Sequence, residues 1–259
     1  MTDIIVVSDL HSGHYVGITP PEYQIKEVSG RSKRSKHASI QKETWDWFRR
    51  ELRKLGRPKL CIVPGDLIDG DGSRSGGTEL ITTDRIEQAN IATTALEYIG
   101  ADEYSFAYGT GYHTGNAEDY EDIIAKHFGS KIGSHEWIRF KGKTFDIKHH
   151  IKGSAIPHGR LTPLSKEVMA NEAWHARGEQ PKADCLIRGH VHQFNYLEQR
   201  VGDRIVKAFT APALQAYGSK FGARRCSDPV DVGFVSINID KDGIHVTPHI
   251  AHLSCLKAS

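Results

Sequence analysis

The chain has 259 residues, a formal net charge of +2 at pH 7, 38% hydrophobic residues and 25% charged residues. This length suits one large α/β domain with a sizeable core, and the mixed charge argues against a strongly basic nucleic-acid binder. No apolar run approaches the roughly 20 residues of a membrane span, and the start "MTDIIVV" lacks a signal-peptide pattern. We therefore expect a cytoplasmic protein without a membrane partner.

Hydrophobic patterning predicts strands that alternate with helices in the first half and hairpins in the second. The predicted strands lie at 4–14, 59–66, 103–109, 136–150 (two strands around a Lys-Gly-Lys turn) and 184–192, with later hairpins turning at 201–203 and 240–243. The predicted helices lie at 39–55, 83–99, 117–128 and 163–177. A polar stretch at 15–37 contains the basic run "GRSKRSKH" (30–37).

This order of elements predicts the fold class. Early alternation and late hairpins favour mixed rather than purely parallel sheets, in a mixed α/β fold. No repeat, low-complexity tract or long linker divides the sequence, so we expect a single domain over residues 1–259.

The cysteines give no sign of disulfides or of a thiolate metal site. Cys61, Cys185, Cys226 and Cys255 are far apart and form no C-x-x-C pair. The 15 histidines are more than core packing readily explains, and several of them recur at strand ends.

Carboxylates and imidazoles stand where five predicted strands end. They are Asp9 and His11 after "IIVVS", Asp66 and Asp69 after "KLCIVPG", His113 after "EYSFAYGTGY", His149 and His150 after "FDIK", and His190 and His192 after "CLIRG". Because the carboxyl ends of strands in an open α/β sheet converge on one crevice, we expect these side chains to share one pocket.

Such a pocket needs a positive partner, because unpaired buried charges are costly and no arginine or lysine matches them. Mixed nitrogen and oxygen ligands without thiolate favour Mn, Fe, Co or Zn over Mg or Ca. The ligand count exceeds the need of one tetrahedral ion and suits two ions that share a carboxylate. Each motif alone also fits a capped turn or surface histidines, but their joint occurrence in this order points to metal.

The order of motifs resembles that of the calcineurin-like metallophosphoesterase superfamily, whose pattern is D-x-H, G-D-x-x-D, G-N-H-D/E, a histidine and G-H-x-H. The matching stretches are "DLH" (9–11), "GDLID" (65–69), "HH" (149–150) and "GHVH" (189–192). The third motif deviates, and its form is similar to versions in phage-encoded members. The resemblance implies a sandwich of two mixed β-sheets flanked by helices.

The resemblance also implies a ligand set for two divalent transition-metal ions, Mn or alternatively Fe, Zn or Co. The implied ligands are Asp9, His11 and His192 for one ion, His149 and His190 for the second, and Asp66 as the bridge between them. His149 is favoured over His150 because it directly follows "FDIK". Asp69 would orient or support the site rather than bind.

In the deviant motif, "YGTGYHTGN" (108–116), Tyr112 stands where the family asparagine ligand should precede His113. We expect His113 to be the catalytic histidine, and the other interpretations are a metal ligand or an ordinary loop residue. Thr110 follows its glycine as the family asparagine does, whereas Asn116 carries the right amide further along. We favour Thr110 or a water over Asn116 as the replacement for the asparagine.

The implied chemistry is phosphoester hydrolysis. A hydroxide that bridges the ions would attack phosphorus in line with the leaving oxygen, while His113 protonates the leaving group. A dinucleotide-binding oxidoreductase is a rival, but the spacing of "GTGYHTG" does not fit its fingerprint. A non-catalytic scaffold that kept the fold is the other rival.

The substrate is the least constrained property. Phosphomonoesterase, protein phosphatase and phosphodiesterase activities all occur in one superfamily. The basic residues Arg31, Lys33, Arg34 and Lys36 favour a phosphodiester, with nucleic acid among the candidates, although such a run also suits a solvated loop. The sequence does not define the oligomeric state.

Overall fold

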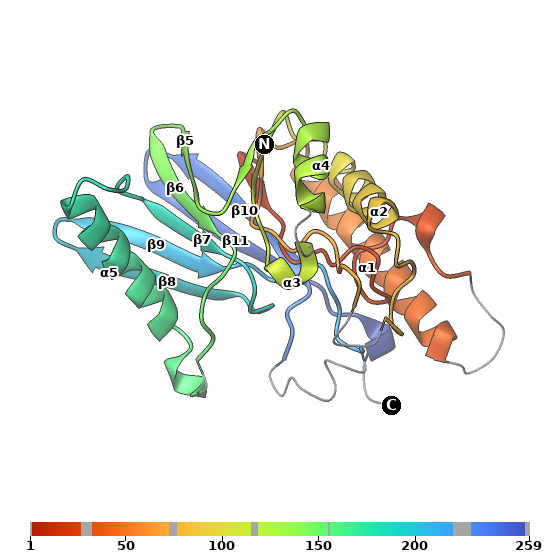
Figure 1. Ribbon diagram of the computed structural model, residues 1–259. Helices are drawn as coiled ribbons and strands as arrows, with labels where there is room; N and C mark the ends of the chain where they lie inside the picture. The colour runs from red at the N-terminus through yellow and green to blue at the C-terminus, as the bar shows by residue number, and fades with distance from the viewer. Residues whose placement is uncertain are drawn as a thin grey trace.

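The computed structural model describes residues 2–26, 33–72, 77–114, 119–154, 156–219 and 229–256. These residues form two mixed β-sheets flanked by helices, which confirms the predicted fold class (Figure 1). The first sheet contains, in spatial order, β11 (Gly243–Ile250), β10 (Gly233–Asp240), β1 (Ile4–Val6), β2 (Leu60–Val63), β3 (Glu103–Ala107) and β4 (Ile132–Gly133). The second contains β5 (Glu136–Phe140), β6 (Lys143–Lys148), β7 (Cys185–Arg188), β9 (Arg204–Thr210) and β8 (Asn195–Val201).

Helices cover the outer faces of both sheets. The α-helices are α1 (Lys33–Leu55), α2 (Arg85–Glu97), α3 (Gly111–Thr114), α4 (Tyr120–His127) and α5 (Thr162–Ala176), and short 3-10 helices are η1 (Pro21–Tyr23), η3 (Pro157–Gly159) and η4 (Ser254–Leu256). Figure 1 shows α1, α2 and α4 on one side of the strands and α5 on the other. Among the described helices, none combines the length and the apolar character needed to cross a bilayer.

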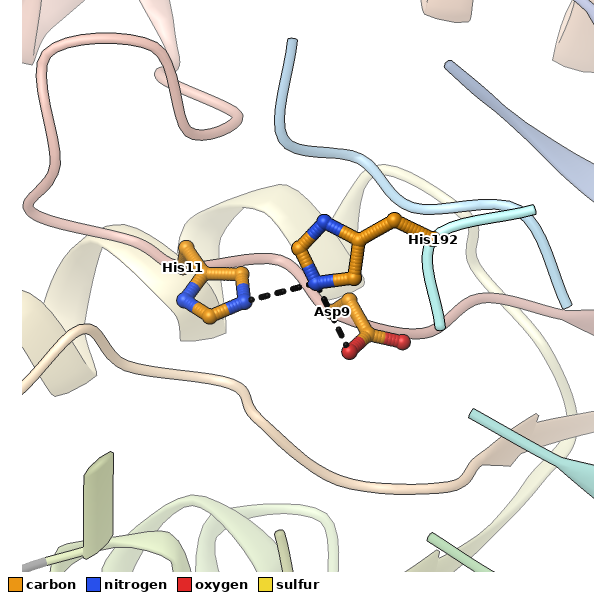
Figure 2. Close-up of side chains that lie close together, drawn as sticks. All are labelled: Asp9, His11 and His192. Carbon is orange, nitrogen blue, oxygen red and sulfur yellow. Dashed lines mark hydrogen bonds and ion pairs between the residues drawn. The ribbon is translucent and has the colours of Figure 1, made fainter. Parts of the chain in front are cut away.

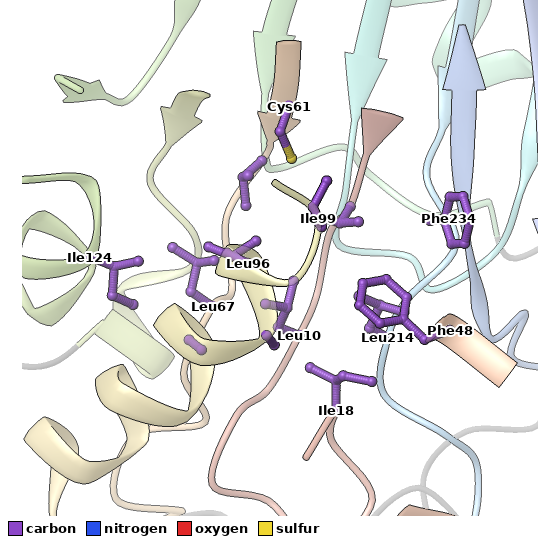
Figure 3. Close-up of a cluster of buried hydrophobic side chains, with 14 of the residues drawn as sticks. Leu10, Ile18, Phe48, Cys61, Leu67, Leu96, Ile99, Ile124, Leu214 and Phe234 are labelled. Atoms are coloured by element: carbon purple, nitrogen blue, oxygen red, sulfur yellow. The ribbon is translucent and has the colours of Figure 1, made fainter. Parts of the chain in front are cut away.

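The first strand shows how the layers are built. Ile5 faces α1, α2 and α4, whereas Ile4 and Val6 face the second sheet, because successive side chains of a strand point to opposite faces. The helix-side core contains Phe48, Leu67, Leu96, Ile124 and Phe234 (Figure 3). The core between the sheets contains Ile62, Phe145, Ile147, Ile187 and Phe209. A third core packs Leu164 and Val168 of α5 against Leu186 and Val206.

Most predicted elements are present, and two boundaries differ most from the prediction. The first strand was predicted at 4–14 but ends at Val6, and the positive φ angles of Asp9 and His11 show that the chain beyond it is not an extended strand. The helix predicted from residue 39 begins at Lys33, so most of the basic run is helical rather than a loop. Lysine, arginine and alanine favour helix, and no glycine or proline interrupts 33–55. Arg31 lies outside the described residues.

Parallel strands of both sheets end at one edge, and this edge carries the candidate site. The neighbours β1, β2 and β3 are parallel, and so are β6, β7 and β9. Hydrogen bonds join the loops that follow them across the two sheets: Leu214 N donates to Ser8 O at 3.1 Å, and His190 N donates to Asp9 Oδ2 at 3.1 Å. Segments that are distant in sequence therefore meet at this edge.

Candidate metal centre

The loops after β1 and β2 run side by side and hold each other by backbone hydrogen bonds. Asp9 N donates to Gly65 O at 3.1 Å, His11 N donates to Asp66 O at 3.1 Å, and Ser12 N donates to Leu67 O at 3.0 Å. The first two motifs are thereby aligned with each other before any of their side chains interact.

Positive φ angles mark the residues that carry the site. Six non-glycine residues of the described chain have positive φ, and Lys141 in a hairpin turn is the one outside the predicted ligand set. The other five are Asp9 (51°), His11 (44°), Asp66 (52°), His190 (74°) and His192 (54°). This conformation costs about 1–3 kcal/mol per residue and persists where surrounding contacts enforce it, which is common at functional sites.

Three side chains of the predicted first ion site face one point (Figure 2). His192 Nε2 lies 3.2 Å from Asp9 Oδ1 and 3.2 Å from His11 Nε2. Asp9 is fully buried, and its other oxygen accepts a hydrogen bond from Ser8 Oγ at 2.5 Å. Two nitrogens and one oxygen are thus directed into one small space.

A second group forms around the carboxylate of Asp66. Asp66, His149 and His190 each offer one ligand atom, and these atoms lie within 4.8 Å of one another. His149 Nε2 lies 3.0 Å from Asp66 Oδ2, whereas His150 is exposed and belongs to no such group among the described residues. The structure therefore places His149, not its neighbour, beside Asp66.

Hydrogen bonds on Nδ1 fix the direction of three imidazoles. His11 Nδ1 lies 3.0 Å from Asp69 Oδ1, His149 Nδ1 lies 2.6 Å from Pro64 O, and His113 Nδ1 lies 2.9 Å from Asp69 O. Because these oxygens can only accept, Nδ1 carries the hydrogen in each ring and Nε2 is left to face the site. Asp69 thus contacts two of these imidazoles, and its supporting role stays a prediction.

His113 lies at the margin of the centre, on the four-residue helix α3. Its Nε2 is 4.0 Å from Asp66 Oδ2, and its ring packs edge-on against His11 with centroids 4.5 Å apart. His11, Asp69 and His113 also meet the geometric criterion for a metal group. His113 is therefore near enough to act on a bound group, and its role as proton donor or ligand stays a prediction.

Thr110 lies directly against Asp66. Its backbone N donates to Asp66 Oδ1 at 2.6 Å, and its hydroxyl donates to the same oxygen at 2.9 Å. Asn116, the other candidate for the missing asparagine, lies outside the described residues. Gly109 is required beside Thr110, because a Cβ at this position would collide with the Asp66 carboxylate and backbone.

The electrostatics of the cluster favour cations. Burial acts to raise the pKa of Asp9, but the charge and contact of His192 outweigh it and lower the pKa to about 2. Burial opposes protonation of His149, but the adjacent Asp66 and the charge of Asp9 outweigh it and raise the pKa to about 9. Burial and the charge of His149 lower the pKa of His190 to about 4.

The donor set fits divalent transition-metal ions. Donor atoms that share one cation at about 2.1 Å lie roughly 3.0–3.4 Å apart, and the spacings of 3.2 Å around His192 Nε2 match this range. His149 Nε2 is buried and has no hydrogen bond of good geometry to any described residue, although Asp66 Oδ2 is close. Orphaned nitrogens beside carboxylates suit Mn, Fe, Co or Zn.

Glu121, on the first turn of α4, is a supporting residue that sequence reasoning missed. Its fully buried carboxylate accepts hydrogen bonds from Leu67 N at 2.7 Å and from Gly109 N at 2.8 Å. It thereby joins the loop that carries Asp66 to the loop that carries Thr110. Burial, together with the charge of Asp66, raises the pKa of Glu121 to about 8. Glu121 could not be recognised from the sequence, because acidic residues are common in the first turn of a helix.

Comparisons with known proteins show similar folds but no close relative. No family model and no curated protein matches the sequence. Solved structures with a similar fold include an archaeal phosphodiesterase (12% identity, TM-score 0.46, covering 95% of this chain and 99% of that chain). They also include Vps29 of Entamoeba histolytica complexed with zinc (13%, 0.44, 95% and 98%) and a predicted phosphoesterase of Streptococcus pneumoniae (11%, 0.40, 96% and 98%). With identities this low and TM-scores below 0.5, the function has to be argued from the site itself.

Metal stoichiometry tests the two groups. Asp66→Ala should lower the affinity for both ions, because we expect this carboxylate to contact both, whereas His192→Ala should spare the second ion. Manganese content after equilibration with excess metal is the measurement, with Asp242→Ala in a distant turn as control. At most one ion per wild-type chain under saturating manganese would contradict the dinuclear interpretation.

The pKa of His149 predicts pH-dependent metal binding. A cation at Nε2 must displace the proton that the ring holds below about pH 9, so affinity at this site should rise about tenfold per pH unit from about pH 6 to about pH 8. Calorimetry in buffers of different ionisation enthalpy would report the released proton. His150→Gln should leave this dependence unchanged, and a pH-independent affinity would contradict the assignment.

Glu121 should position the second motif. Glu121→Gln replaces one accepting oxygen by a donor, so one of the two backbone N–H groups loses its partner at a cost of about 1–3 kcal/mol. We expect lower stability in urea and weaker manganese binding. Asp122→Asn, on the next and more exposed residue, is the matched control. If the two variants have the same stability and the same manganese affinity, the Glu121 contacts do not position the second motif.

Proposed function

We propose that the protein is a metal-dependent phosphoester hydrolase of the calcineurin-like metallophosphoesterase type, with two manganese ions. The observation that carries the proposal is the meeting of two three-residue donor groups, one around Asp9 and one around Asp66, at the strand ends of both sheets. Asp9, His11 and His192 would hold one ion, His149 and His190 the other, and Asp66 would contact both. Such ions would activate water near neutral pH and neutralise charge on the phosphoryl oxygens.

The chain's own residues would orient the reaction. Asp69 keeps Nδ1 of His11 protonated and so directs its Nε2 to the ion site. The Asp69 carbonyl does the same for His113, so that His113 Nε2 faces the site. From this position the protonated ring would give its Nε2 proton to the departing oxygen, and the Nδ1 hydrogen bond would hold the ring in place.

The proposed substrate class is a phosphodiester, with nucleic acid as a candidate. Of the basic run that supports nucleic acid, Lys36 is exposed on the first turns of α1, and the side chains of Arg31, Lys33 and Arg34 lie outside the described set. The alternatives are a phosphomonoesterase or protein phosphatase, and a scaffold without catalysis. A manganese-supplemented panel of nitrophenyl monoester, nitrophenyl diester, and single- and double-stranded DNA separates them. Metal binding without turnover of any substrate would support the scaffold.

His113 should matter most when the leaving group is poor. An alkoxide needs a proton to depart, whereas nitrophenolate leaves almost unaided. His113→Ala should therefore lose about 100-fold or more activity on an alkyl ester, far less on a nitrophenyl ester, and keep both ions. Initial rates on the two esters and metal content are the measurements. Loss of one ion in this variant would make His113 a ligand instead.

A further inference from the structure

A side pocket opens beside the metal centre. It has a volume of about 450 Å³, which lies in the ~300–1,000 Å³ range of small-molecule sites. His190 and His192, one from each donor group, form part of its wall. A group attached to a phosphate held at the metal centre would therefore enter this pocket.

The other walls of the side pocket come from segments that follow the second sheet's strands. Residues 151–154, which follow β6, line it together with Pro163 and Leu164 of α5 and Val191 of the last motif. Ile151 and Leu164 are buried, and they give this wall an apolar surface. Such a surface suits a sugar or a flat base rather than a fully hydrated group.

The charged lining is cationic. Lys152 and Arg160 line the side pocket, and no Asp or Glu is among the described residues that do so. Lys152 is exposed and makes no ion pair within the described chain. A cation without a neighbouring carboxylate favours an anionic ligand group.

The cationic character continues beyond the side pocket. An adjoining pocket of about 530 Å³ shares Lys152 and is also lined by His150 and Lys166. Its one described acidic residue, Glu167, is already paired with Lys148 at 2.8 Å and with Arg188 at 2.9 Å. Lys152 therefore stands between two pockets whose described lining residues include no unpaired carboxylate.

We propose that the side pocket binds a nucleoside phosphate unit joined to the phosphate that is cleaved. Lys152 contacts the second phosphate of this unit, and the apolar wall contacts its sugar and base. This inference rests on the proposed phosphoesterase function and narrows its substrate to diesters that carry a further phosphate. Lys152 then sets specificity, whereas a generic diester needs only the metal centre.

The test compares two ligands of the manganese-loaded protein, thymidine 3′,5′-bisphosphate and thymidine 3′-monophosphate, by calorimetry. Lys152→Ala should weaken the bisphosphate about tenfold and change the monophosphate little, as expected for one charge-assisted contact to phosphate. Lys152→Arg should keep most of the wild-type affinity for the bisphosphate. Hydrolysis of bis(4-nitrophenyl) phosphate by the wild-type protein reports the proposed hydrolase activity separately.

Lys241→Ala is the matched control for charge. Lys241 lies in the turn between β10 and β11, and β10 runs antiparallel to β1 with Ile4 opposite Ile237. This turn is therefore at the end of the sheet away from the metal centre, and the variant should bind both ligands as the wild type does.

The outcomes separate this inference from the proposed function. The side pocket assignment is overturned if the wild type binds the two ligands with equal affinity. It is also overturned if the Lys152→Ala and Lys241→Ala variants lose the same affinity for the bisphosphate. Turnover of the generic diester together with such a result leaves the hydrolase intact. If Lys152→Ala selectively weakens binding of the bisphosphate but no substrate is hydrolysed, the side pocket assignment is supported and the proposed hydrolase function is overturned.

Discussion

The carboxylate of Asp66 is the group on which the arrangement of the site depends. It accepts the N–H and hydroxyl hydrogen bonds of Thr110 from the loop after β3, and it faces the His149 nitrogen from the second sheet. The backbone carbonyl of the same residue accepts a hydrogen bond from His11 N, in the loop after β1. One residue thus connects three loops of the first sheet to the second sheet. A cation bound to this carboxylate would therefore be positioned by the contacts that hold Asp66 in place.

Buried ion pairs of Arg188, the last residue of β7, stabilise the end of this strand. Arg188 is 1% exposed and pairs with Asp146 at 2.6 Å and with Glu167 at 2.9 Å. Its guanidinium also donates to the carbonyls of Asp146 and Ile187. Removing one partner of such a pair leaves an uncompensated buried charge and costs about 3–5 kcal/mol. The network therefore fixes the strand end from which His190 and the rest of the last motif depart.

The sequence was informative where chemistry and periodicity coincide. Polar residues after apolar strands predicted that Asp9, Asp66 and His192 would lie in one region, because strand order and parallel pairing bring such ends together. Glu121 could not be predicted in the same way. Its role depends on two backbone N–H groups that become neighbours only after the loops have folded. The hydrogen bonds from Thr110 to Asp66 have the same origin, since they join the loops that follow β3 and β2.

Boundaries failed for a related physical reason. The apolar run of β1 continues to Val7, and alternation alone gives no sign that the ladder stops at Val6. Beyond the strand, Asp9 and His11 adopt positive φ angles, and hydrogen bonds to the neighbouring loop hold this conformation. The local sequence favours a longer strand, but tertiary contacts determine where β1 ends.

The strained backbone also bears on the proposed metal centre. Five residues of the predicted ligand set adopt positive φ, at about 1–3 kcal/mol each, which together is comparable to the whole net stability of a domain. Buried carboxylates and imidazoles add a further electrostatic cost. Without a metal ion, protonated imidazoles such as His149 would balance the carboxylates, and in the proposed function a cation would take the place of these protons. The strain in the backbone is present in either case, and it directs the same side chains towards the position that this cation would occupy.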